Sequence, residues 1–322
     1  MTDHVPTISI EAQAFLDRNR ASSLPPMHRR AWLARRARER VAQREAPVIA
    51  DIESRLITDV TRTETDGVPV VSIAPTNALP GSADYAIYVH GGAFMFGGAK
   101  DALGMLMADA LGLEVVSLEY PLGPEEVYPA ALDACMRAYE NITGSLGASC
   151  VLLGASTGAN LVLAMMQRVR ERGLVRPAGI ALISPCVDLH PAGDSRMANA
   201  VRDPVARWRN QFDKAFTTYA RYAEVENPLV SPIYADFTGD YPPTIITTGT
   251  RDLFLSDSVR LSSHMRRAGL DPELRVHEGM WHAFLDQPDI PEAAQSRQDV
   301  ALFLNQALLA NVAGDRPVTA RT

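Results

Sequence analysis

Short continuous apolar runs alternate with longer amphipathic stretches from about residue 56 to residue 311. Most of these runs lack a polar face, which is typical of strands that are covered on both sides. The stretches between them repeat apolar residues at the spacing of one helix face. Eight strands are predicted, at residues 56–61, 68–74, 85–90, 114–119, 149–154, 178–184, 243–248 and 273–278. Helices are predicted at about 100–112, 129–145, 158–172, 256–268 and 292–311.

The order of these elements predicts an α/β fold. Strands that alternate with helices form a mainly parallel sheet with right-handed crossovers, and the helices cover both faces. The first two strands are an exception, because Asp66 and Gly67 between them favour a tight antiparallel hairpin. We therefore expect a doubly wound, mostly parallel sheet of eight strands with the hairpin at one edge.

Two regions depart from the alternation, one at the N-terminus and one after residue 186. Up to about Pro47, we expect a helix capped by Ser9 and an arginine-rich helix at about 27–45. A charged, helix-like segment at 203–222 lies in an insertion whose length is typical of a lid or cap over a sheet edge. The predicted organisation assigns 1–48 and 187–234 to a helical cap, 49–186 and 235–312 to an α/β core, and 313–322 to a flexible tail.

The composition is that of a globular protein without a nucleic-acid partner. Of 322 residues, 47% are hydrophobic and 21% are charged, and the formal net charge is −7. This acidic balance opposes binding to phosphate backbones. There is no run of about 18 apolar residues that could span a membrane, and the first residues lack a secretory pattern, so a cytoplasmic location is expected. The cysteines favour buried free thiols and are too few for a structural zinc site, which leaves no metal expected: Cys135, Cys150 and Cys186.

The most informative short motif is Gly-Ala-Ser-Thr-Gly at residues 154–158. It follows a predicted strand and leads into a predicted helix, which is the strand–turn–helix setting of a nucleophile elbow. Such a turn exposes the hydroxyl of Ser156 above the sheet, and the next helix directs its N-terminus at the reacting oxygen. The same pattern also occurs by chance in glycine-rich turns, so its meaning depends on partners elsewhere in the chain.

A serine hydroxyl needs a general base, and in this topology the base should follow the carboxyl end of a strand. His282 meets that requirement, because it lies just beyond the predicted strand 273–278 and before the last helix. His190, in the insertion, is its main rival. The remaining histidines lie where other roles are expected: His4, His28, His90, His264 and His277.

The acid that orients the base should also follow a strand, and Asp252 comes soon after the predicted strand 243–248. Asp257 lies one helical turn later, where a carboxylate in the first turn of a helix stabilises the helix dipole. We therefore favour Asp252 as the acid. The chain order is then Ser156, Asp252 and His282, which is the order found in α/β-hydrolases.

Donors for an oxyanion should lie close to the nucleophile. The backbone N–H of Thr157 is one, because it follows Ser156 directly. Others are expected from His-Gly-Gly-Ala-Phe at residues 90–94, where small residues let the backbone approach a developing oxyanion. Each such donor contributes about 3–4 kcal/mol to transition-state stabilisation.

With these residues placed, the chain resembles the hormone-sensitive-lipase-like esterases of the α/β-hydrolase superfamily, the bacterial family IV group. The resemblance covers nearly the whole chain and is specific because its motifs occur together and in order. The segments that carry it are 90–94 with Gly97, 120–125, 128–133, the elbow at 154–158, 184–185 with Asp188, the Asp252 segment, and 282–284.

The resemblance implies a serine carboxylesterase that hydrolyses short- to medium-chain acyl esters without a cofactor. It implies the α/β-hydrolase fold with a helical cap, and oxyanion amides at Gly92, Ala93 and Thr157, with Gly91 shaping the loop. Ala93 stands where the family usually has a third glycine after the histidine. Ala155 and Thr157 stand where it usually has Asp and Ala on either side of the elbow serine. The larger side chains at 93 and 157 are expected to affect the size of substrate that the pocket accepts. Members of this family often pair through the last strand and helix, here about 272–311, so the resemblance allows a homodimer without requiring one.

Three functional readings follow for a small-molecule ester substrate. An esterase is the first, a lactone or natural-product ester hydrolase with the same triad is the second, and a non-catalytic ligand receptor is the third. A peptidase fits less well, because the sequence predicts an enclosing cap and no extended groove. The candidate pocket residues are large and apolar: Phe94, Phe96, Leu189, Trp208, Phe212 and Trp281.

Overall fold

The computed structural model describes residues 7–19, 30–79, 82–221 and 223–312. The expected tail at 313–322 and the histidines His4 and His28 lie outside these residues. The eight predicted strands form one sheet in the order β1-β2-β4-β3-β5-β6-β7-β8. The strands are β1 (Ile57–Thr65), β2 (Val68–Pro75), β3 (Tyr85–Val89), β4 (Glu114–Leu118), β5 (Cys150–Ala155), β6 (Ile180–Ile183), β7 (Thr244–Gly249) and β8 (Glu273–His277).

The pairing of the strands confirms the predicted topology. The strands from β4 and β3 across to β8 are parallel, whereas β1 and β2 form the expected antiparallel hairpin at one edge. The hairpin joins the sheet through β2, which is antiparallel to β4. The carboxyl ends of the parallel strands therefore meet at one edge of the sheet, where the candidate residues were expected.

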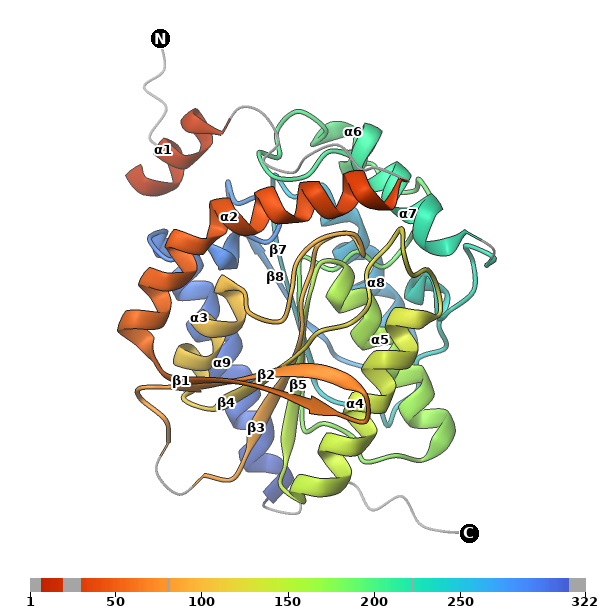
Figure 1. Cartoon of the computed structure of the whole chain (residues 1–322). Coiled ribbons are helices and arrows are strands. Elements are labelled where there is room, and N and C mark those ends of the chain that lie inside the picture. The colour runs from red at the N-terminus through yellow and green to blue at the C-terminus, as the bar shows by residue number, and fades with distance from the viewer. Residues whose placement is uncertain (1–6, 20–29, 80–81, 222, 313–322) are drawn as a thin grey trace.

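Helices cover both faces of the sheet, as Figure 1 shows. One face carries α3 (Ala102–Leu111) and α9 (Pro291–Val312), and the other carries α4 (Ala130–Leu146), α5 (Thr157–Arg172) and α8 (Leu255–Arg267). In the central strands, successive residues enter opposite cores, so β3, β5 and β6 are continuously apolar: in β3, Ile87 packs in one cluster and Ala86 in the other.

The remaining helical elements are α1 (Ile10–Arg18), α2 (Ala31–Leu56), α6 (Ser195–Ala198), the π-helical turn η1 (Trp208–Phe212), α7 (Asp213–Ala220), and the 3₁₀ turns η2 (Pro232–Tyr234) and η3 (Phe284–Asp286). In Figure 1, α2 runs along the top of the sheet beside α6 and α7. Arg38 of α2 donates to the carbonyl oxygens of Met95 and Gly123, which places this helix over the loops that follow β3 and β4. Within the described ranges, no helix combines the length and the apolar character needed to cross a membrane.

Two helix predictions were wrong in their bounds. The arginine-rich helix continues through Pro47 to Leu56, so the expected boundary at residue 48 falls inside a single helix. A proline inside a helix costs roughly 3 kcal/mol, but burial of Ile52 against the core beneath favours continuation. In the insertion, the expected helix at 203–222 begins only at Trp208, with a π-helical turn.

The late start of that helix has a local cause. The side chain of Asp203 accepts hydrogen bonds from the backbone N–H groups of Val205 and Ala206, at 2.9 and 3.0 Å. An aspartate that binds its own chain two and three residues later forms a turn that competes with a helix.

Candidate active site

Ser156 occupies the sharp turn between β5 and α5, with φ 54° and ψ −118°. This is a strained conformation for a residue with a side chain. The two glycines of the motif make the turn possible. A Cβ on Gly158 would lie 2.0 Å from the carbonyl oxygen of Val89, and one on Gly154 would lie 2.6 Å from the carbonyl oxygen of Gly158. The expected elbow is therefore present, and its glycines are required by close backbone approach.

The structure brings Ser156, His282 and Asp252 together in one hydrogen-bonded chain. His282 Nε2 lies 2.9 Å from Ser156 Oγ, and His282 Nδ1 lies 2.9 Å from Asp252 Oδ1. With its proton on Nδ1, the imidazole donates to the carboxylate and accepts from the serine hydroxyl. All three side chains are almost fully buried, at 4%, 4% and 0% exposure for Ser156, His282 and Asp252.

The charges in this chain stabilise a positively charged imidazole. Burial acts to lower the pKa of His282, but the nearby carboxylates, with Asp252 foremost, together outweigh it, so the pKa is raised above its usual value. Burial likewise acts to raise the pKa of Asp252, but the charge and hydrogen bond of His282 outweigh it and lower the pKa. Asp252 therefore stays ionised beside a ring that can accept a proton.

The Asp252 carboxylate is fixed from more than one side. Its Oδ2 accepts from the hydroxyl of Thr248, at 2.8 Å, and its Oδ1 accepts from the backbone N–H of Phe254, also at 2.8 Å. Thr248 belongs to β7, so the strand itself orients the acid. The loop that carries His282 is fixed in a similar way, because the backbone N–H of Ala283 donates to Ser184 Oγ at 2.9 Å.

The segment after β3 lies beside the elbow in an unusual backbone conformation. Gly92, Ala93 and Phe94 all have positive φ, at 117°, 58° and 59°. At Ala93 the left-handed region costs about 1 kcal/mol relative to glycine. The backbone N–H of Phe94 donates to Thr157 Oγ1 at 3.3 Å, which ties this segment to the elbow. Gly91 packs on the elbow too, because a Cβ there would lie 3.2 Å from Ser156 Cβ.

Three backbone N–H groups near Ser156 are free to bind a ligand. They belong to Gly92, Ala93 and Thr157, and none donates a hydrogen bond to another group within residues 7–19, 30–79, 82–221 and 223–312. The first N–H groups of a helix have no partner inside it, which explains Thr157. These are the amides that the sequence predicts as oxyanion donors.

Aromatic side chains from the insertion and from the loop before α8 lie beside His282. The ring of Phe212 lies 5.9 Å from the imidazole, and that of Phe254 lies 5.2 Å from it. Phe94 stacks on Tyr219 at 3.6 Å. We call the following six residues the aromatic cluster: Phe94, Trp208, Phe212, Phe216, Tyr219 and Phe254.

Three of the six predicted pocket residues thus belong to the aromatic cluster. Phe96 and Leu189 are buried in the same core. Trp281 belongs to the other core, where it stacks on Phe15 of α1 at 4.2 Å. Phe216 and Tyr219 lie at helical spacing from Phe212, whereas nothing in the sequence indicated that Phe254 would join them.

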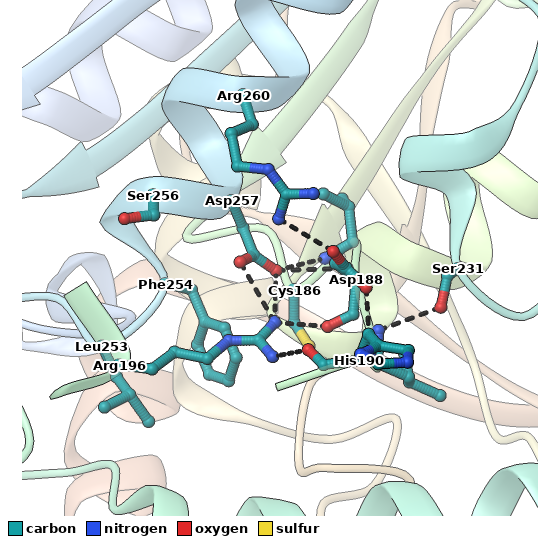
Figure 2. Close-up of polar contacts among 12 residues, drawn as sticks. Cys186, Asp188, His190, Arg196, Ser231, Leu253, Phe254, Ser256, Asp257 and Arg260 are labelled. Atoms are coloured by element: carbon teal, nitrogen blue, oxygen red, sulfur yellow. Dashed lines mark hydrogen bonds and ion pairs between the residues drawn. The ribbon is translucent and has the colours of Figure 1, made fainter. Parts of the chain in front are cut away.

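Asp257 does more than the predicted stabilisation of a helix dipole. It is fully buried and forms an ion pair with the buried Arg196, at 3.0 Å. Its carboxylate also accepts the backbone N–H groups of Val187 and Asp188, at 3.0 and 3.2 Å. Figure 2 shows Asp257 together with Arg196 and Asp188. The guanidinium of Arg196 lies 4.5 Å above the ring of Trp208. Asp257 therefore anchors the insertion to α8, a role that the sequence did not reveal.

Sequence reasoning also missed Asp203, a fully buried carboxylate beside the triad. Its Oδ2 accepts the backbone N–H groups of Leu253 and His282, at 2.9 and 3.3 Å. The available signal was Asp-Pro at 203–204, a turn pattern. That signal predicts a turn and says nothing of the distant loops that the carboxylate binds.

Neither His190 nor His277 is hydrogen-bonded to Ser156. His190 is exposed in the insertion, and His277 lies near Ser296, with His277 Nε2 3.2 Å from Ser296 Oγ.

The three cysteines are buried and free. In the part of the chain that the structure describes, no three or more His, Cys, Asp or Glu side chains are grouped to hold a metal ion.

Comparisons with known proteins agree with this geometry. A family model described as alpha/beta hydrolase fold matches residues 86–286. Among curated proteins, an esterase of Acinetobacter venetianus is 29% identical over 231 residues, which cover 67% of this chain and 73% of that protein.

Solved structures show the same likeness over a longer span. Esterase E25 superposes with a TM-score of 0.84 at 27% identity, covering 95% of this chain and 98% of E25. A hormone-sensitive lipase from a metagenome library superposes with a TM-score of 0.76 at 28% identity, covering 92% of this chain and 98% of its own.

Proposed function

The chain belongs to the α/β-hydrolase fold family and is a carboxylic ester hydrolase of the hormone-sensitive-lipase type; from this premise we propose that it hydrolyses short- to medium-chain acyl esters through an acyl-enzyme on Ser156. The observation that carries the proposal is the unbroken chain from Ser156 Oγ through His282 to Asp252, with both joining distances at 2.9 Å. We also propose that the N-terminal helices and the insertion form the cap over this site.

The proposed reaction begins with attack of Ser156 Oγ on the ester carbonyl while His282 Nε2 takes the hydroxyl proton. Asp252 keeps the proton on His282 Nδ1 and stabilises the imidazolium that forms. The carbon–oxygen bond to the leaving alcohol then breaks, and His282 gives its proton to that oxygen. Water next attacks the acyl-enzyme with His282 as base, which releases the acid and restores Ser156.

The negative charge of each tetrahedral intermediate would be held by the amides of Gly92, Ala93 and Thr157. These N–H groups are already oriented by the positive-φ loop and the start of α5, so little reorganisation is needed when charge develops. The buried setting strengthens each hydrogen bond. We expect the aromatic cluster beside His282 to limit the depth available to the acyl chain, which would favour short and medium acyl groups.

A series of 4-nitrophenyl esters tests this proposal, together with a fluorophosphonate probe. We expect turnover of the acetate to octanoate esters, a decline for palmitate, and one phosphonyl group per chain on the peptide that contains Ser156. A lactone panel at the same enzyme concentration separates the two enzymatic readings. Labelling of Ser156 without ester or lactone turnover would show an activated nucleophile whose substrate is not in the two panels. Absence of both labelling and turnover would refute the proposed nucleophile and support the receptor reading.

We expect Thr157→Val to lower kcat/KM by about fivefold, with most of the loss in kcat. Valine keeps the shape of threonine but removes the hydroxyl that accepts the N–H of Phe94. The segment of Gly92, Ala93 and Phe94, which we call the oxyanion loop, would then lose this hydrogen bond to the elbow. Steady-state kinetics with 4-nitrophenyl butyrate measures the effect.

Thr143→Val is the matched control for this change. Thr143 is also buried, but its hydroxyl donates to the carbonyl oxygen of Tyr139 within α4, away from the site. We expect unchanged kinetics for the control. Equal losses in the two variants would contradict a link between Thr157 and the oxyanion loop.

A further inference from the structure

The base of the insertion is bonded to the two loops that carry Asp252 and His282. Asn199 donates its side-chain N–H groups to the carbonyl oxygens of Thr250 and Asp252, at 3.1 and 2.9 Å. Ser195 donates its hydroxyl to the carbonyl oxygen of Leu253 at 2.8 Å. The insertion thus binds the loop that holds the proposed acid through several polar side chains, in addition to lying over the site.

Asp203 is the side chain that joins both loops at once. Its Oδ2 accepts the N–H of Leu253, next to Asp252, and the N–H of His282 itself, at 2.9 and 3.3 Å. Its Oδ1 is used by the insertion, through Val205 and Ala206. Within the described ranges each oxygen therefore accepts two amides, so the carboxylate connects three separate segments of the chain.

We propose that Asp203 is a positioning residue for ester hydrolysis, which fixes the Asp252 loop and the His282 loop relative to each other and presents a negative charge to the imidazole. The inference rests on the proposed function of His282 as the general base. An amide in place of the carboxylate cannot satisfy the four N–H donors, because one of its two ends is itself a donor. The loops would then separate or rotate, and small displacements of a base strongly reduce turnover.

The charges around His282 give this proposal a distinctive consequence. Three carboxylates act on the ring, those of Asp252, Asp203 and Asp286, and each raises the pKa of His282 against the opposing effect of burial. The other neighbours of the ring are the Ser156 hydroxyl and the uncharged rings of Phe212 and Phe254. Burial raises the pKa of Asp203 itself to about 6, so at neutral pH this group is mostly ionised.

Asp203→Asn tests the proposal by kinetics and by NMR. The base must be neutral, so activity falls as the pH drops through the pKa of His282; removing a nearby negative charge lowers that pKa. We expect the acid limb of kcat/KM for 4-nitrophenyl butyrate to move down by about one pH unit, and kcat to fall about tenfold with little change in KM. The pKa of the His282 ring, followed by NMR, should move by the same amount.

Two further variants separate charge from placement and from folding. Asp203→Glu keeps the charge but moves it, so we expect an unchanged acid limb and a lowered kcat; this variant also serves if Asp203→Asn does not fold. Asp257→Asn removes another buried carboxylate that binds two insertion amides. We expect the acid limb of its kcat/KM profile to stay at the wild-type pH.

An acid limb and a His282 pKa that do not move in Asp203→Asn, or wild-type kcat in both Asp203 variants, would overturn the proposal. Failure of the proposed function is seen separately, as absence of ester turnover in the wild-type protein. The NMR titration of His282 still reports on Asp203 in that case.

Discussion

Replacing Ser156 with alanine should lower kcat for 4-nitrophenyl butyrate by about 10⁴- to 10⁶-fold. The hydroxyl is the only group placed at hydrogen-bonding distance from His282 Nε2 within the part of the chain that the structure describes. Without it no acyl-enzyme forms, and only the oxyanion amides and substrate binding remain to assist attack by water. Those two contributions account for the small residual rate that such variants retain over the uncatalysed reaction. Stopped assays at high enzyme concentration measure this residual rate.

The control is Ser145→Ala, which removes an exposed hydroxyl that donates to a carbonyl of its own helix. We expect this control to turn over substrate at the wild-type rate and to be labelled by the fluorophosphonate probe. Ser156→Ala should not be labelled. Alanine at position 156 relieves no clash and keeps the elbow glycines, so both variants should melt close to the wild type. Turnover by Ser156→Ala within tenfold of the wild type would refute the acyl-enzyme mechanism.

The sheet and the elbow could be predicted because local patterns determine them. A buried parallel strand must be apolar on both faces, so central strands such as β3, β5 and β6 are visible as apolar runs in the sequence. The edge hairpin of β1 and β2 is instead indicated by Asp66 and Gly67 between its strands. The elbow needs glycines where a Cβ would meet backbone, as at Gly158, and this requirement leaves a mark in the sequence. Their positions just after predicted strands then suggested Asp252 and His282, because groups at the carboxyl ends of parallel strands meet at one edge.

The helices above the sheet were predicted less well, because packing there overrides local preference. Pro47 is a strong signal for the end of a helix, yet α2 continues to Leu56 over a buried Ile52. The segment at 203–207 has the composition of a helix start, but the Asp203 side chain binds its own backbone first. The first outcome depends on packing against a core formed by distant segments, and the second depends on the orientation of one side chain, which the residue pattern does not show.

Residues that join distant segments of the chain were beyond sequence reasoning. Asp257 lies in the first turn of a helix, which accounts for an acidic residue there without any partner. Its partner Arg196 is 61 positions away. It lies in a part of the insertion where no apolar periodicity predicts a helix or strand. Asp203 and His282 are 79 positions apart. Such pairs become visible only when the insertion is seen folded against α8 and the loop after β8.

Replacing Asp257 with asparagine should lower the free energy of unfolding by about 3–5 kcal/mol, because it leaves the charge of Arg196 buried without its partner. Arg196 is 2% exposed and Asp257 is 0% exposed, so water cannot replace the lost contact. The backbone N–H groups of Val187 and Asp188 would also compete for the one remaining acceptor oxygen. Urea unfolding, followed by tryptophan fluorescence, measures the change.

The double variant Arg196→Met/Asp257→Asn distinguishes an unpaired charge from a general loss of packing. Methionine fills much of the arginine volume and can keep contact with Trp208 and Phe254, which the guanidinium now covers at 4.5 and 5.3 Å. Since no charge is then left unpaired, the double variant should be more stable than Asp257→Asn alone. Losses that simply add would show that the two residues act independently, and that the anchoring of the insertion does not depend on their ion pair.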